Sequence, residues 1–205
     1  MYQALHATSE TLRQFVLDRI LADTLLAGPA SQFTLRNMKV LLNTPQEMVE
    51  LGHEGVSLWL YRVLRDDHRL NDPPRRTSAT QLAPAPLPLR LYYLVTPITT
   101  MKNQGDPETE QYLLGKVLQS LHSYPIVRGA DLQAEFKGAD VELHVRLESL
   151  SLEEITRVWD ALEGSYQLSV SYEVSVVNID SAREPDSRTP VTQVLPEIGQ
   201  IVGAA

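Results

Sequence analysis

The chain has 205 residues, of which 43% are hydrophobic and 21% charged, a composition typical of one folded globular domain. It contains no cysteine, which excludes disulfide frameworks, thiolate zinc sites and thiol catalysis. Its 26 acidic and 18 basic residues give a formal net charge of -8, so we expect no phosphate-binding surface and no nucleic-acid partner.

No apolar run approaches the length of about 18 residues that a membrane helix needs, so we expect no membrane insertion. The first ten residues also lack the basic and apolar regions of a secretory signal. We therefore expect the protein to be cytoplasmic when it is synthesised.

The first half of the chain predicts one helix followed by three strands. Apolar residues at helical spacing indicate a helix over 9–26, whose apolar face is so wide that it packs on two sides or is covered by another subunit; we favour two-sided packing. Alternating apolar residues predict strands over 33–42, 56–64 and 87–96. The second strand is bulky on both faces, which places it centrally in its sheet. Residues 44–55 are expected to form a loop.

A long proline-rich segment lies between the last two of these strands. Residues 65–86 contain four prolines and few apolar side chains, which predicts little regular structure. Loops of this length inside a compact domain are generally functional or disordered. Arg75 and Arg76 form the only adjacent basic pair of the chain, and on an acidic protein this pair is a candidate docking point for an acidic partner. A solvated loop is the alternative interpretation.

The second half predicts two helices and two strands. Asp106 is a candidate N-cap followed by Pro107, and the helix that they begin ends at Pro125. A strand with one solvent-exposed face is expected over 141–148, and a long strand, the last of the sheet, over 166–179.

A second helix is expected between these two strands. A capping box from Ser151 to Glu154 begins it and Gly164 ends it. The residues expected on its buried face are Leu152, Ile155, Val158, Trp159 and Leu162. The sequence leaves open whether the flanking strands are parallel. Together these elements predict an α+β fold with a single mixed β-sheet of about five strands, packed with about three helices.

Residues 181–205 are expected to form an extended C-terminal arm, and residues 1–180 the folded domain. Prolines and glycines argue against a stable helix in the arm, but polar tails rarely keep this many aliphatic residues. A sparse apolar spacing falls at Val191, Val194, Leu195, Ile198 and Ile201. An arm that is ordered by the surface on which it docks and a frayed terminus are equally good interpretations.

No motif for catalysis, metal binding or cofactor binding emerges. The five histidines are not paired at metal-ligand spacing, and the chain has neither a Gly-x-Ser-x-Gly turn nor a glycine-rich phosphate loop. A cation at residues 66–68 is conceivable, but polar residues at a strand end are the simpler interpretation. We therefore expect a protein that is not an enzyme. For an active site assembled from distant residues, the first candidates would be His144, Tyr172 and Glu173.

Several segments, in this order and spacing, resemble a bacterial family first described as a domain of unknown function. Its members include the cap, or tail terminator, of phage-tail-like contractile injection systems such as the antifeeding prophage and the Photorhabdus virulence cassette. The resemblance covers roughly residues 5–180. The segments that carry it are 57–63 (SLWLYRV), 69–71 (RLN), 73–75 (PPR), 87–97 (LPLRLYYLVTP), 110–125, 152–162 and 166–172 (YQLSVSY).

The resemblance implies a tail-terminator-like fold and a structural role. It implies a ring, expected to be hexameric, that closes the distal end of the inner tube and the contractile sheath and so fixes the length of the tail. The expected partners are further copies of this chain and the sheath and tube subunits, in a tail-like particle that is assembled in the cytoplasm and then released. The residues expected at partner interfaces are Arg75, Arg76, Val191, Val194, Leu195, Ile198 and Ile201.

Two other classes of function stay open at this stage. One is a phage tail-completion or connector protein, whose ring would have a basic lumen that faces DNA. The other is an enzyme of a class that the motifs do not identify. No sequence motif supports either alternative.

Overall fold

A six-stranded mixed sheet forms the centre of the structure, a computed structural model that describes residues 2–71, 73, 75–78, 80–99 and 105–187. In spatial order its strands are β1 (Lys39–Leu41), β2 (Gly55–Arg65), β5 (Leu87–Ile98), β8 (Val170–Ile179), β7 (Glu142–Leu147) and β6 (Ile126–Arg128). Strands β1 and β2 are parallel, and all other neighbours in this sheet are antiparallel. The predicted α+β fold with a mixed sheet is confirmed, with one strand more than expected.

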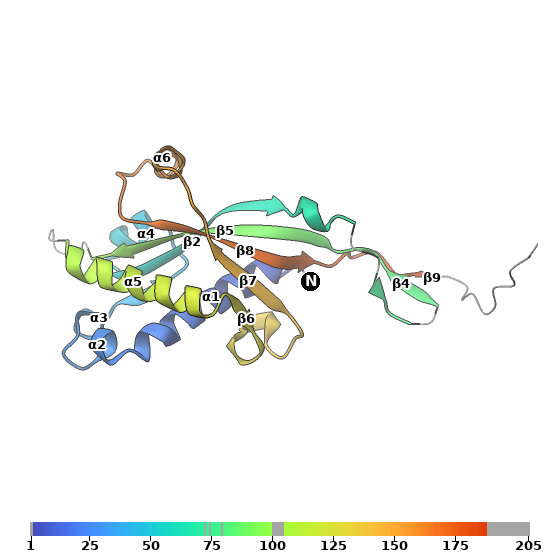
Figure 1. Cartoon of the computed structure of the whole chain (residues 1–205), viewed down its shortest axis with the longest axis horizontal. Helices are drawn as coiled ribbons and strands as arrows, with labels where there is room; N and C mark the ends of the chain where they lie inside the picture. The colour runs from blue at the N-terminus through green and yellow to red at the C-terminus, as the bar shows by residue number, and fades with distance from the viewer. Residues whose placement is uncertain (1, 72, 74, 79, 100–104, 188–205) are drawn as a thin grey trace, which may run out of the picture.

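Helices cover both faces of this sheet (Figure 1). Helices α1 (Ala4–Leu21) and α5 (Pro107–Ser123) pack on one face, and α6 (Leu152–Ala161) packs on the other. The shorter helices are α2 (Thr24–Ala27), α3 (Gln32–Leu35) and α4 (Pro45–Glu50), and single 3-10 turns occur at Gly129–Asp131 and Ala134–Phe136. Within the described residues, no helix combines the length and the hydropathy needed to cross a membrane.

Strand β5 is buried on both of its faces. Leu91 and Tyr93 point to the core beneath α1 and α5, whereas Leu94 joins Trp159 in the smaller core beneath α6. The Tyr93 hydroxyl lies 2.8 Å from the Ser9 hydroxyl, whose own hydrogen is directed at the Leu5 carbonyl. Tyr93 is therefore the donor to Ser9, and this bond satisfies a polar group in the middle of the core.

Two β-bulges change which side chains face the helices. One lies at Tyr61 in β2, because Leu60 is opposite Tyr93 and Arg62 is opposite Tyr92. Arg62, which the alternation placed on the same face as Leu60, therefore lies on the opposite face, with its guanidinium 5.4 Å from the Tyr92 ring centre. An extra residue in one strand of an antiparallel pair has this effect on the alternation.

The second bulge lies in β8. Leu89 is opposite Val177, while Leu91 is opposite Val174, so β8 has one residue more than β5 between these pairs. Val177 is consequently buried, although the alternation predicted for this strand puts odd-numbered residues on the polar face. Strand β8 also begins at Val170 rather than at residue 166.

The predicted helix over 9–26 is wrong at both ends. Helix α1 begins at Ala4 and ends at Leu21, and Asp23 then caps the separate helix α2 by accepting the backbone N–H of Leu25. The wide apolar face is also not packed on two sides, because the Leu21 and Leu25 side chains are 54% and 77% exposed. Leu21 is the last residue of α1, and Leu25 lies on α2, beyond the break between the two helices.

Residues 32–55 differ most from the prediction. Ser31 caps the helix α3 within the predicted strand, so only Lys39–Leu41 is extended. The expected loop contains helix α4, which begins with a capping box between Thr44 and Glu47. Both differences arise because the polar residues that cap a short helix are of the same types as those that form a loop, so the sequence pattern does not distinguish the two.

The second half of the chain follows the prediction more closely. Helix α5 has Asp106 as N-cap, and α6 has the predicted capping box at Ser151. Leu152 is the exception on α6, since its side chain is 70% exposed rather than part of the buried face. The strands on either side of α6 are antiparallel neighbours.

The start of α5 is tied to the start of β2 by a charged cluster. The Asp106 carboxylate accepts the hydroxyl and the backbone N–H of Thr109, and the Arg36 guanidinium lies 3.5 Å away. Arg36 also pairs with Glu54, which is almost fully buried. The two Thr109 hydrogen bonds, and after them the attraction of Arg36, lower the pKa of Asp106.

Replacing glycine by alanine should change the stability of the fold in opposite directions at two positions. A Cβ at Gly55, whose φ is +126°, would lie 2.0 Å from the Lys39 carbonyl oxygen, whereas a Cβ at Gly115 in α5 would meet nothing within 4 Å. We expect Gly55→Ala to lower the free energy of unfolding by about 2 kcal/mol or more, and Gly115→Ala to raise it by about 0.5–1 kcal/mol. Urea unfolding followed by circular dichroism measures both, and equal stability of the two variants would contradict the β1–β2 register.

The lowered pKa of Asp106 predicts a loss of stability in acid. A carboxyl with a lowered folded-state pKa stabilises the fold above its unfolded value of about 3.9, and this contribution disappears as the pH falls through the folded value. Asp106→Asn keeps the cap but removes the charge, so we expect a shallower fall of stability between about pH 5 and pH 2. The control Asp140→Asn removes an exposed carboxylate that caps no helix. Identical pH profiles for wild type and Asp106→Asn would refute the prediction.

Candidate assembly interface

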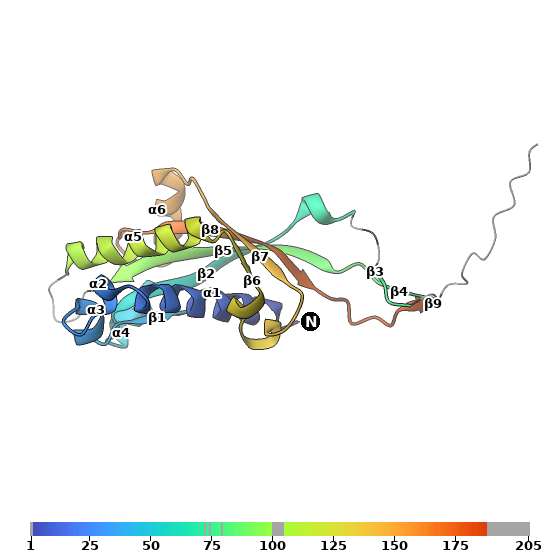
Figure 2. The ribbon, with the colours of Figure 1, turned by 60° about the horizontal axis from the view of Figure 1, so that its bottom comes forward.

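A projection continues from the sheet beyond the part that the helices cover. We call it the extension and define it as residues 67–87 and 180–187. It contains a 3-10 turn at Asp67–Arg69 and a small sheet of β3 (Arg75–Arg76), β4 (Gln81–Ala83) and β9 (Asp186–Ser187), in the order β3-β4-β9. Figures 1 and 2 show the small sheet at the end of the molecule, away from all helices. This sheet is additional to the one that the sequence predicts.

The small sheet joins two segments that are distant in the sequence. Strands β3 and β4 form an antiparallel hairpin within the proline-rich segment 65–86, for which little regular structure was predicted. Strand β9 pairs antiparallel with β4, with Gln81 opposite Ser187 and Leu82 opposite Asp186. The long loop and the beginning of the arm at 181–205, the two predicted interface segments, therefore meet in one sheet.

The extension has no core of its own. Among its described residues none is buried, and Leu82 and Ala83 are only partly covered. Sheets of such short strands are marginally stable in water unless something packs against them. The extension is therefore a surface that gains stability when another molecule covers it.

The segment around the Arg75–Arg76 pair is more basic than the chain as a whole. Residues 62–90 contain six arginines and three aspartates, whereas the whole chain has a net charge of -8. Arg76 lies on β3 and is exposed, and Arg75 precedes it on the same strand. The five predicted contact residues of the arm, Val191, Val194, Leu195, Ile198 and Ile201, lie outside the described residues.

A buried carboxylate fixes the base of the extension. Glu173 on β8 lies 3.2 Å from the Arg146 guanidinium and 3.6 Å from that of Arg90, and it accepts a hydrogen bond from the Tyr92 hydroxyl at 2.9 Å. Burial and this hydrogen bond to a carboxylate raise the pKa of Tyr92 to about 12, so its hydroxyl remains a donor at neutral pH. Arg90 also lies 3.7 Å from Asp66, directly after β2. The cluster thus connects four segments where the sheet leaves the helices.

The three candidates for an active site do not converge. Tyr172 faces the core under α1 and α5, while its neighbour Glu173 faces the opposite side of the sheet. His144 is exposed and lies near Glu142, at 3.9 Å. Burial raises the pKa of Tyr172 to about 12, which makes it a poor base. Within the described residues no group of three or more His, Asp or Glu could hold a metal ion.

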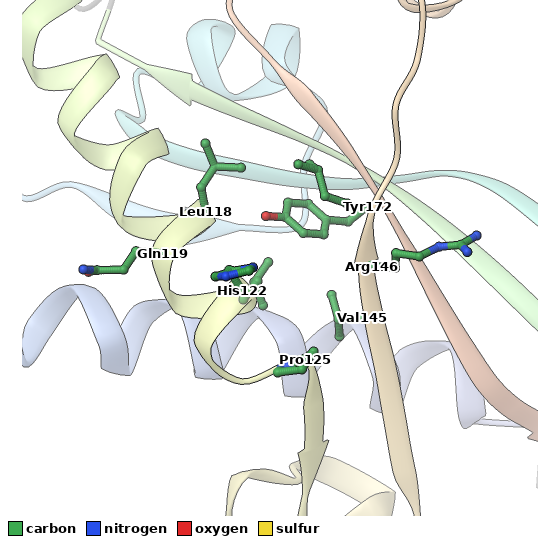
Figure 3. A pocket seen from close by; sticks show the side chains of 9 residues that line it. Leu118, Gln119, His122, Pro125, Val145, Arg146 and Tyr172 are labelled. Carbon is green, nitrogen blue, oxygen red and sulfur yellow. The ribbon is translucent and has the colours of Figure 1, made fainter.

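A second surface feature is an apolar groove between α5 and the outer edge of β7, with a volume of about 710 Å³. Figure 3 shows Leu118 and His122 on the helix side, Val145 on the strand side and Tyr172 reaching toward α5 from β8. Arg146 points away from the groove. No sequence pattern indicates this groove, because it depends on β6 being too short to cover β7.

Sequence reasoning also missed the pairing that completes the extension. Strand β9 has only two residues and carries no periodic apolar pattern, and β6 has three. Elements of this length lie below what alternation can indicate. The proline-rich segment 65–86 and its Arg75–Arg76 pair were the signals that pointed to the extension.

The comparisons with known proteins agree with this architecture. One solved structure, a cryo-EM structure of the PVC sheath/tube terminator of an extracellular contractile injection system in its extended state, has a TM-score of 0.58 with 19% identity. The match covers 93% of this chain and 64% of the chain in that structure. The cryo-EM structure of the anti-feeding prophage cap, a tube terminating cap, has a TM-score of 0.56 with 19% identity over 97% of this chain and 61% of that chain.

The chain therefore spans less than two thirds of each of these solved proteins. No curated protein matches its sequence. A family profile, the Pvc16 N-terminal domain, matches residues 7–193 and so includes the whole sheet, helices α5 and α6, α1 from Ala7 onward, and the extension. Because this match extends over most of the chain, the protein belongs to the family of the Pvc16 N-terminal domain.

Proposed function

We propose that this protein is a structural cap, or tail terminator, which closes the distal end of the inner tube and the contractile sheath of an extracellular contractile injection system and thereby fixes its length. The observation that carries the proposal is the fold, which is similar over almost the whole chain to that of a sheath/tube terminator and a tube terminating cap. The family supports the same role.

In this role the protein acts as a homohexameric ring. Each protomer of a ring uses two different surfaces, one for each neighbour. The extension supplies one such surface, because it projects, has no core and contains Arg75 and Arg76. Residues 1–180 form the ring-building domain, and the arm at 181–205 makes further contacts through Val191, Val194, Leu195, Ile198 and Ile201.

The proposed role requires no catalysis, and nothing in it needs a cofactor or a metal. The ring binds sheath and tube subunits, neither nucleic acid nor membrane, and it assembles in the cytoplasm before it becomes part of a particle. The acidic composition supports protein partners over nucleic acid, since nucleic-acid affinity depends mostly on basic side chains.

The mass of the purified protein in solution tests the ring. We expect light scattering after size exclusion, at several concentrations, to give six times the mass of the chain, and negative-stain images of that species to show six-fold rings. Mixing with sheath and tube subunits of the same particle should yield a complex that contains all three. A protein that stays monomeric alone and binds neither subunit would refute the proposal.

Charge reversal tests the extension as one of the ring surfaces. We expect Arg76→Glu to shift the protein toward smaller species, since it removes the basic character of β3 without touching the core. The matched control is Arg157→Glu, which reverses an exposed arginine on α6. Urea unfolding should show equal stability of Arg76→Glu and wild type. Unchanged rings in Arg76→Glu would show that Arg76 is not at an interface.

A further inference from the structure

We propose that the groove between α5 and β7 is the binding site for residues 188–205 of a neighbouring copy of this chain. The inference rests on the proposed self-association and names the contact through which one protomer holds the next. It depends on three observations: the lining of the groove, the free edge of β7 and the place where the described chain ends.

The lining suits an apolar peptide. Six of the nine residues that form the groove are apolar or aromatic, and they come from three elements and the turn after α5: Leu118, Leu121, Pro125, Val145, Leu147 and Tyr172. Leu147, at the margin of the groove, is 48% exposed. An apolar groove with exposed apolar margins is typical of an interaction site.

The backbone of β7 is open beside the groove. The Glu148 N–H donates to Ser171, so the even-numbered residues of β7 turn their backbone groups toward β8. The Val145 N–H donates in the other direction, to the Pro125 carbonyl at 2.8 Å. Strand β6 stops pairing at His144, so the N–H and C=O of Leu147 face the groove. An extended peptide in the groove can bond to this edge while its side chains enter the apolar lining.

The C-terminal residues match this lining in composition. Residues 188–205 contain the five apolar side chains named for the predicted arm and only two charged residues, Arg188 and Glu197. Burial of such side chains in a groove contributes about 25 cal/mol for each Å² of apolar surface removed from water.

The position of β9 indicates that the occupant comes from another copy. Strand β9 ends at Ser187 in the small sheet, at the end of the molecule that is remote from α5 and β6 (Figures 1 and 2). The residues from 188 to 205 reach at most about 60 Å when fully extended. The described chain therefore ends far from the groove of its own protomer, which favours the groove of a neighbouring copy.

Disulfide trapping in the full-length, cysteine-free chain tests the contact. One protein carries Leu147→Cys. The second protein has a different tag and carries a single cysteine, which replaces Val191, Val194, Leu195, Ile198 or Ile201 in five separate variants. A disulfide requires Cα atoms within about 7 Å. On mild oxidation of the mixed proteins, we expect at least one pair to give a covalent heterodimer. The control Leu35→Cys, on an exposed leucine of α3, should give none.

A synthetic peptide of residues 188–205 provides the competition control. At about ten times its Kd the peptide should lower the heterodimer yield about tenfold, because only about one groove in ten stays open, and a scrambled peptide should not. Absence of any heterodimer, or equal yields with Leu35→Cys, would overturn the inference. The inference would also be overturned if a chain that carries both cysteines formed only the intramolecular disulfide.

Light scattering on the same unoxidised proteins separates this inference from the proposed function. Hexamers without heterodimer trapping would refute the groove contact and leave the cap intact. Trapping without a closed ring would support the groove contact and contradict the hexameric cap.

Discussion

The structure depends on the burial of β5 between two layers. Its odd-numbered residues from Leu89 to Val95 pack into the core under α1 and α5, and Leu94 on the other face packs under α6. Almost every side chain of the strand is therefore removed from water, at a gain of about 25 cal/mol per Å² of apolar surface. The Tyr93–Ser9 hydrogen bond pairs a polar group that this burial encloses. Helices on both faces then leave the sheet edges and the extension for contacts with other molecules.

Strong periodicity made much of this fold predictable. The strands around 56–64, 87–96 and 141–148 follow directly from the alternation of apolar residues. The starts of α5 and α6 follow from their capping residues, Asp106 and Ser151. The exposed position of Arg76 was also predictable, because prolines exclude that segment from the sheet core.

The features that the sequence did not predict depend on contacts between distant residues. The bulges at Tyr61 and in β8 change which side chains face the helices, and alternation within one strand cannot show them. Short helices such as α4 match the pattern of a loop, since their capping residues are also turn residues. The groove beside β7 exists only because β6 is short, and the extension only because β9 returns to β4.

The return of β9 to β4 has a consequence for the order of events during synthesis. The pairing of Leu82 with Asp186 closes a loop that includes most of the sheet, and contacts of such long range form late in folding. A chain that stops before β9, or that has not yet folded its sheet, therefore cannot display the complete extension. The complete small sheet is therefore present only once the protomer is finished and its main sheet has folded.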